Sequence, residues 1–240
     1  MAHKTGRRGG DLRTLLSLVR RTVLPPGPPL PSPIAGFDFL YYTFPDATIV
    51  NTVAGQPDGT INEPLNNTFV SGANSYLSMY YDPFPGQCGN LTLPTYTVRT
   101  LEVWWQYPAG LPPAGQYILD ARVGSTGYWI SSNSAGAFDN IGAALVDAVP
   151  YFNTVAGAPL TAGATPDTLN ALSGAGWQQM VLVLAADETD DITLFSRFSG
   201  EQGTISAELA ECYVYDYALT AQEIKDLYNA KCSRYGLPFV

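Results

Sequence analysis

The sequence contains very little histidine, and this excludes several kinds of active site. His3 is the only histidine among 240 residues. Ser-His-Asp and Cys-His sites need an imidazole to take the proton of the nucleophile, so neither can be built in the body of the chain. Zinc also lacks a set of ligands, because the cysteines stand at no metal-binding spacing and no histidine supplements them.

Cysteine is scarce as well. Cys88, Cys212 and Cys232 form an odd set, whereas a disulfide framework uses pairs. We therefore expect reduced, buried thiols. A bridge between Cys212 and Cys232 that pins the last helix is an alternative that the sequence leaves open.

Long apolar runs and nucleotide-binding motifs are missing. No run approaches the ~18–20 apolar residues that a membrane-spanning helix requires. No G-x-x-x-x-G-K-[ST] or G-x-G-x-x-G motif stands between a strand and a helix. The sequence therefore predicts neither a membrane span nor a nucleotide site.

Glycine and proline are abundant, at 23 and 19 residues, while charged residues make up only 14% and aromatic residues 12%. This composition favours many strands joined by tight turns over a helical bundle. A chain of this length can bury a sizeable core in one such domain. We expect an all-β domain over residues 34–240, with about twelve to fourteen strands.

Charge is distributed unevenly along the chain. Residues 1–33 hold six basic residues and one acidic residue, a net charge of +5, whereas residues 34–240 hold 6 basic and 20 acidic residues, a net charge of −14. An acidic body should not bind nucleic acid. The basic segment suits nucleic acid or an acidic protein surface.

Residues 1–24 are expected to form a basic amphipathic arm. Leucine and valine recur at helical spacing from residue 11 to residue 24, with arginine elsewhere around the helix. A helix of roughly 13 residues is marginal alone in water, so we expect it to dock on a partner. The residues assigned to docking are Arg7, Arg8, Leu12, Arg13, Leu15, Leu16, Val19, Arg20 and Arg21. A mitochondrial-type presequence is the rival interpretation of this pattern.

A proline-rich spacer follows the arm at residues 25–33. It has six prolines in nine residues, which favours polyproline II at ~3 Å per residue, or about 28 Å if extended. Such a spacer would hold the arm away from the body.

Strand patterns are clear in two stretches near the start and middle of the body. Residues 37–44, FDFLYYTF, predict an aromatic strand that is the first of the domain. Residues 97–107 alternate in a way typical of a strand with two different faces. One face carries Leu101, Val103 and Trp105, and the other carries Thr100, Glu102 and Trp104.

The last quarter of the body predicts three more strands. They fall at residues 180–186, 192–198 and 206–217. The acidic residues of 187–191 cannot enter a core, so we expect the chain to turn there.

A capping box begins the helix that follows. Thr220 and Glu223 can each bond the backbone N–H of the other, and Leu219 can pack on Ile224 as a hydrophobic staple. One helical face then carries Ile224, Leu227 and Tyr228. These signals predict a short amphipathic helix.

Four motifs, in this order, resemble the laminin-G-like, concanavalin A-like jelly-roll domains. They are FVSGANSYLS at residues 69–78, TVRTLEVWW at 97–105, GWQQMVLVL at 176–184 and VYDYALTAQEIKDLY at 214–228. The resemblance implies an antiparallel β-sandwich jelly roll with one short C-terminal helix, over roughly residues 36–229. It implies little about function, because this fold hosts lectins, glycosidases and adhesion modules alike.

The sequence does not favour an enzyme. Glucanases of this fold carry E-x-D-x-x-E on a strand, and this chain has no such run. Glycoside hydrolysis needs two carboxylates about 5–10 Å apart. Glu208 and Glu211 would point to opposite sides of a strand, and Glu102 has no partner in sequence. A glycoside hydrolase is therefore the last of the alternatives.

Sugar binding would use an exposed aromatic side chain with amide and carboxylate groups nearby. Two places in the sequence fit this description. One is Glu102 with Trp104, and the other is Tyr128 and Trp129 with Asn133.

Calcium is the one cofactor to consider, since several relatives implied by the resemblance hold it at the rim of the sandwich. Calcium takes about 6–8 oxygen ligands. The candidate ligands are Asp187, Asp190, Asp191 and Asp139. A solvated acidic turn is the simpler alternative.

The sequence predicts a non-enzymatic structural or adhesion component of a large assembly. A virus or phage particle is the expected location, with the chain as a capsid decoration, tail or fibre protein. The arm would bind other structural proteins, the chain would be present in many copies or as a homo-oligomer, and the sandwich would be free to contact host polysaccharide. The alternative is a free or surface-attached carbohydrate-binding module, lectin-like and extracellular.

Overall fold

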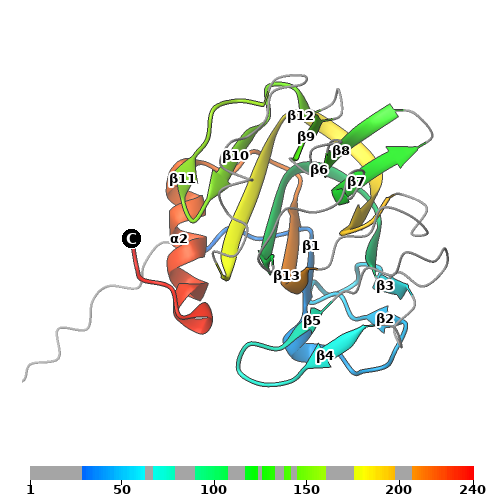
Figure 1. Ribbon diagram of the computed structural model, residues 1–240. Helices are drawn as coiled ribbons and strands as arrows, with labels where there is room; N and C mark the ends of the chain where they lie inside the picture. The colour runs from blue at the N-terminus through cyan, green and yellow to red at the C-terminus, as the bar shows by residue number, and fades with distance from the viewer. Residues whose placement is uncertain are drawn as a thin grey trace, which may run out of the picture.

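The computed structural model describes the chain from residue 29 onward, with gaps (Figure 1). The described residues are 29–62, 67–78, 90–107, 117–123, 126–132, 138–141, 145–160, 176–197 and 207–240. The predicted arm at residues 1–24 and residues 25–28 of the spacer lie outside them.

The described residues form thirteen strands and one α-helix. The strands are β1 (Ala35–Asp38), β2 (Thr48–Ile49), β3 (Gly59–Asn62), β4 (Thr68–Val70), β5 (Tyr76–Ser78), β6 (Asn90–Gln106), β7 (Tyr117–Val123), β8 (Thr126–Ser132), β9 (Phe138–Ile141), β10 (Val149–Phe152), β11 (Val155–Ala156), β12 (Gln178–Leu194) and β13 (Glu208–Tyr215). The helices are the 3-10 helix η1 (Phe39–Tyr41), α2 (Ala221–Lys231) and the 3-10 helix η4 (Cys232–Tyr235). All strand pairings among them are antiparallel, which confirms the predicted all-β fold with one short C-terminal α-helix.

Two 17-residue strands, β6 and β12, run through both layers of the sandwich. Residues 100–106 of β6 pair with β13, and residues 90–92 pair with β3. Residues 180–183 of β12 pair with β10, and residues 193–194 pair with β7. The first layer therefore also contains β4, β5, β1, β13, β10 and β11. The second layer also contains β2, β3, β7, β8 and β9 (Figure 1).

The core lies between the layers and takes one side of each long strand. In β6 the predicted alternation is confirmed: Leu101, Val103 and Trp105 are buried in the main core. Trp104 points the other way and packs with Tyr228 of α2 in a separate cluster. This follows from the period of two along a strand, which sends successive side chains to opposite faces.

Helix α2 covers the outer side of the first layer (Figure 1). The predicted capping box is confirmed, since Thr220 N donates to Glu223 Oε2 at 2.8 Å and Glu223 N donates to Thr220 Oγ1 at 3.2 Å. Leu219 and Ile224 share one buried cluster, as the staple requires. The buried helical residues are Ile224, Leu227 and Tyr228. Among the described residues, no helix is long and apolar enough to cross a membrane.

The expected turn at residues 187–191 is wrong, because β12 continues through the acidic stretch. Its register against β6 shifts between Val183, which pairs with Thr100, and Glu188, which pairs with Val98. Several residues of β12 thus oppose a single residue of β6. Such a bulge lets the strand carry charged side chains outward without ending.

The prediction of an aromatic strand over residues 37–44 is correct only for Phe37 and Asp38 and wrong for residues 39–44. Strand β1 ends at Asp38, and η1 follows. The Asp38 carboxylate accepts a hydrogen bond from Leu40 N at 2.8 Å. A side chain that caps the backbone two residues ahead favours a tight turn over a strand.

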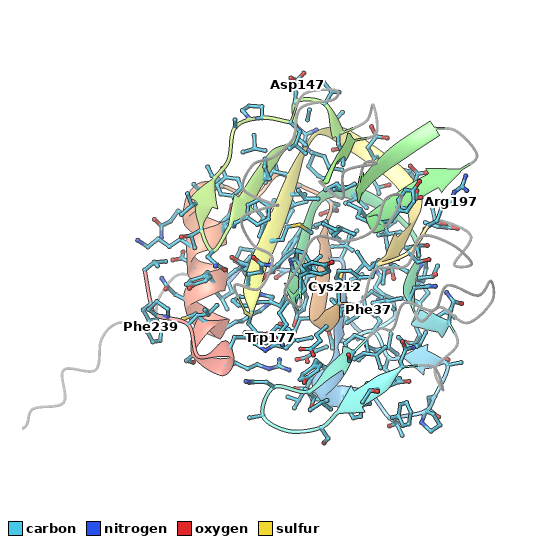
Figure 2. The ribbon with its side chains drawn as sticks, viewed as in Figure 1. Phe37, Asp147, Trp177, Arg197, Cys212 and Phe239 are labelled. Atoms are coloured by element: carbon cyan, nitrogen blue, oxygen red, sulfur yellow. The ribbon has the colours of Figure 1, made fainter. Side chains whose placement is uncertain are left out.

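Cys212 and Cys232 are both unbridged and buried, as expected, whereas Cys88 lies outside the described residues. Cys212 lies in the main core, where Figure 2 labels it near Phe37, while Cys232 belongs to the cluster beneath α2. The two thiols thus lie on opposite faces of the first layer. Burial, more than the nearby Glu102 carboxylate, raises the pKa of the Cys212 thiol well above its ordinary value.

Candidate binding surface

Glu102 and Trp104, one of the two expected sugar-binding places, are fully buried. Trp104 is stacked on Tyr235 of η4, with ring centroids 4.5 Å apart, and on Tyr228 of α2, at 5.8 Å. The expected exposed aromatic surface is therefore not present here. The sequence correctly placed the two side chains on one face, but α2 and η4 cover that face.

Glu102 instead accepts a full set of hydrogen bonds beneath the helix. Its Oε1 accepts from Trp104 Nε1 and Gln179 Nε2, both at 2.8 Å, and its Oε2 accepts from the Tyr215 hydroxyl at 2.9 Å. Lys231 Nζ lies 3.2 Å from Oε1. A buried carboxylate is tolerated when its oxygens are satisfied in this way.

Glu211 is the second buried carboxylate under the helix. Lys231 Nζ lies 3.1 Å from its Oε2, and Arg234 Nη1 lies 2.5 Å from its Oε1. The Tyr235 hydroxyl also donates to Oε1, at 2.5 Å. Lys231 therefore bridges both buried acids. We call Asp38, Glu102, Glu211, Lys231 and Arg234 the sub-helix charge cluster.

Burial and neighbouring charge act in opposite directions on the cluster. Desolvation would raise the pKa of Glu211, but Lys231, the Tyr235 hydroxyl and Arg234 together hold that pKa below its ordinary range. Desolvation would lower the pKa of Arg234, but its hydrogen bond to Asp38 and the charge of Glu211 raise that pKa above the ordinary value. Both groups are therefore ionised at neutral pH.

Tyr128 and Trp129, from the other expected sugar-binding place, lie in β8, and Asn133 lies outside the described residues. Trp129 is the register partner of Asp120 in β7, and Asp120 pairs in turn with Thr193 of β12. Strand pairing thus places Trp129 opposite Asp120 in the sheet, and Asp120 opposite Thr193. Sugar binding at this place stays a prediction.

The acidic residues considered for calcium do not share one strand. Asp187 pairs with Arg99 at 3.5 Å, and Asp191 accepts a hydrogen bond from Thr95 Oγ1. Burial, with the charges of Glu188 and Asp191, raises the pKa of Asp190. Asp139 lies in β9. No group of three or more acidic, histidine or cysteine side chains suited to a metal occurs within the described ranges, and calcium binding stays a prediction.

Several exposed apolar side chains belong to two segments that contact each other, residues 40–44 and strand β4, through the ring contacts of Tyr42 and Phe44 with Phe69. Strand β4 lies at the bottom of Figure 1. Tyr41 is 65% exposed, Leu40 45%, Phe44 39% and Val70 37%, and Phe69 lies between Phe44 and the core. We call these five residues the aromatic end patch. Exposed apolar side chains that gather in one region mark an interaction site more often than scattered ones do.

Packed aromatic side chains support the Phe44 and Phe69 rings of the aromatic end patch. Phe44 is stacked on Phe69 with ring centroids 6.4 Å apart and an angle of 12° between the rings. Below them, buried Tyr42 meets Phe69 edge to face at 5.4 Å and donates its hydroxyl to the Asp46 carbonyl at 2.6 Å. Burial and the charge of Asp46 raise the pKa of Tyr42 to about 12, so this hydroxyl keeps its proton.

Arg234 links the two segments that carry the patch. Its Nη1 and Nη2 each donate to the Asp38 carboxylate at 2.9 Å, and Asp38 caps η1. Its Nε donates to the carbonyl of Ala73, in the turn after β4, at 3.2 Å. No sequence pattern indicates the contact between Asp38 and Arg234, because the two residues are 196 apart in the chain.

Removing the Arg234 guanidinium should destabilise the whole domain. Arg234→Met leaves Asp38 and part of Glu211 without a cation, and breaking a buried ion pair in this way costs roughly 3 kcal/mol. Urea unfolding followed by tryptophan fluorescence measures the loss. The matched control is Arg99→Met, which removes the exposed pair with Asp187 and should cost less than about 1 kcal/mol. Equal losses in the two variants would contradict the role of Arg234.

Acidification should weaken the fold through Glu211. Its folded-state pKa lies below the ordinary value of about 4.3. Its stabilisation is thus complete above that ordinary value and is lost as pH falls through the lower folded pKa. We expect the free energy of unfolding to fall below about pH 4.5, and to fall less steeply in Glu211→Gln. Urea unfolding between about pH 3 and pH 7 compares the two slopes, and parallel slopes would exclude Glu211 as the cause.

Comparison with known proteins shows a shared fold. No protein-family description matches the sequence, and no curated protein matches it. Among solved structures, the binding domain of botulinum neurotoxin DC in complex with SialylT aligns with a TM-score of 0.51 and 12% identity, over 83% of this chain and 51% of that chain. The receptor binding domain of botulinum neurotoxin type G aligns with a TM-score of 0.49 and 10% identity, over 87% of this chain and 54% of that chain.

This chain thus spans about half of the length of these toxin domains. At 12% identity the likeness to the neurotoxin DC domain concerns the fold and not the ligand. It shows that this chain folds as a β-sandwich of the kind found in a binding domain.

Proposed function

We propose that this chain is a non-enzymatic binding module that contacts carbohydrate through the aromatic end patch. The observation that carries this proposal is the exposure of Tyr41 and of Phe44, whose ring is stacked on Phe69. A sugar ring has an apolar C–H face that packs on an aromatic ring and hydroxyl groups that remain in water. Aromatic side chains fixed in place offer such contact area at little cost in entropy.

The state of the buried acids supports binding over hydrolysis. A glycosidase needs two carboxyl groups that reach the same glycosidic bond. Glu102 and Glu211 share a layer, but both are buried and paired with Lys231. Neither can touch a sugar chain while α2 stays in place, so a hydrolase stays the last alternative.

Removing the ring of Phe44 should weaken sugar binding. Loss of one stacked aromatic contact of ~1.4 kcal/mol corresponds to about a tenfold rise in Kd. A glycan array identifies a bound sugar, and isothermal titration with that sugar compares wild type with Phe44→Ala. Trp129→Ala, in the same titration, tests the β8 alternative.

The matched control is Phe239→Ala. Phe239 is 70% exposed and lies beside α2, away from β4 (Figure 2). Its Kd should equal that of the wild type. If Phe44→Ala left the Kd unchanged while Trp129→Ala raised it tenfold, the site would belong to β8 and not to the aromatic end patch.

A second candidate function is a structural or adhesion component of a large assembly, such as a virion, that uses the same sandwich. It is favoured by the basic amphipathic pattern of residues 1–24 and by the proline-rich spacer. The spacer leads directly into the body, since Ile34 N donates to Val214 O at 2.8 Å just before β1 begins. In this proposal the arm docks on other structural proteins in many copies and the aromatic end patch stays exposed to the host.

Truncation separates the two candidates. A chain of residues 34–240 should keep the body folded and keep any sugar affinity, because the sheet and α2 are retained. In the assembly proposal it should no longer sediment with particles from the native source, whereas the full chain should. Full incorporation of the truncated chain would contradict docking through the arm.

A further inference from the structure

We infer that the aromatic end patch takes an uncharged sugar chain and rejects anionic ones. This inference rests on the proposed function and names the ligand class for the same site. It is argued from the acidic residues of the described segment that carries Leu40, Tyr41, Phe44, Phe69 and Val70, and from the hydrogen bonds that Arg234 already makes there.

The segment that carries the aromatic end patch has no basic residue of its own. No lysine or arginine occurs between Arg21 and Arg99, so residues 22–98 are free of positive side chains. The described part of this segment contains three acidic residues, Asp38, Asp46 and Asp58, while Glu63 and Asp82 lie outside the described residues. Proteins recognise anionic groups through arginine or lysine, and like charges oppose association. An acidic sugar would therefore meet repulsion at this surface.

Among the described residues, Arg234 reaches the segments that carry the patch from the C-terminal end of the chain, and four of its N–H donors are already used. A guanidinium has five N–H donors. Nη1 and Nη2 contact Asp38, Nη1 also contacts Glu211, and Nε donates to the Ala73 carbonyl. The side chain is only 18% exposed. A carboxylate on a sugar would meet the Asp38 and Glu211 carboxylates beside this guanidinium.

Asp46 is the acidic group best placed to meet a neutral sugar. It follows Phe44 by two residues and its side chain is exposed, whereas Asp38 is held by Arg234 and Asp58 accepts from Asn51 N at 2.8 Å. A carboxylate accepts hydrogen bonds from sugar hydroxyl groups but repels a second carboxylate. Asp46 therefore favours a neutral chain on the adjacent rings.

The test uses the full chain with two sets of soluble polysaccharides. Neutral β-glucan, mannan and galactan form one set, and hyaluronan, heparin and polysialic acid form the other. Kd values are measured by isothermal titration at about 50 mM and about 500 mM salt, since salt screens charge. We expect a neutral polysaccharide to bind and Phe44→Ala to raise its Kd about tenfold. The basic residues 1–33 can attract the anionic set by themselves, so the anionic binding that belongs to the patch is the part lost in Phe44→Ala. We expect that part to be at least tenfold weaker than neutral binding at the lower salt.

Replacing the Asp46 carboxylate with a positive charge should increase the affinity for anionic polysaccharides. Asp46→Lys should lower the Kd for an anionic polysaccharide roughly two- to fivefold at low salt, relative to the uncharged control Asp46→Asn, and the gain should vanish at high salt. The side chain of Asp46 is exposed and makes its hydrogen bond to Tyr42 through the backbone. Both variants should therefore unfold at the same urea concentration as the wild type.

The outcomes distinguish the inference from the function on which it rests. Anionic polysaccharides that bind as tightly as neutral ones, with binding lost in Phe44→Ala, would overturn the inference and leave the proposed function standing. Binding of neither set would overturn both. Self-association at rising protein concentration that is lost in Phe44→Ala would assign the patch to a second copy of the chain and also overturn the inference.

Discussion

The contact on which the rest of the structure depends is the ion pairing of Arg234 beneath the C-terminal segment. The guanidinium lies against Asp38 at 2.9 Å and Glu211 at 2.5 Å, in a site from which water is largely excluded. Removing charges from water is unfavourable unless every partner is present. The cluster is therefore assembled only when α2 and η4 are packed on the sheet, and it disfavours any arrangement in which the C-terminal segment is displaced.

The same contact determines the shape of the surface at the end of the sandwich. Arg234 holds the cap of η1 through Asp38 and the turn after β4 through Ala73. Tyr41 belongs to η1, and the ring of Phe44 is stacked on Phe69 of β4. Binding groups held by packed and hydrogen-bonded supports lose little entropy when a ligand arrives. A buried ionic cluster thus supports an exposed apolar surface.

The β-sandwich itself leaves function open. A binding domain of a neurotoxin has the same fold at 12% identity, and this chain spans about half of it. Folds of this kind host unrelated activities, so function has to be argued from particular side chains. Here those are acids buried beneath a helix and aromatic rings open to solvent. The first arrangement disfavours chemistry on a substrate, and the second favours contact with a partially apolar ligand.

Local patterns in the sequence determined what depends on neighbours along the chain. The alternation around Trp104, the capping box of Thr220 with Glu223 and the all-β composition each act over a few residues, and all three are confirmed. Only the tertiary structure decided which strand face is covered and which stays open. Trp104 is buried because a helix more than a hundred residues away packs on it, and Tyr41 is exposed because no described segment does. Burial depends on contacts between distant segments, whereas a sequence pattern indicates only on which face of its strand or helix a side chain lies.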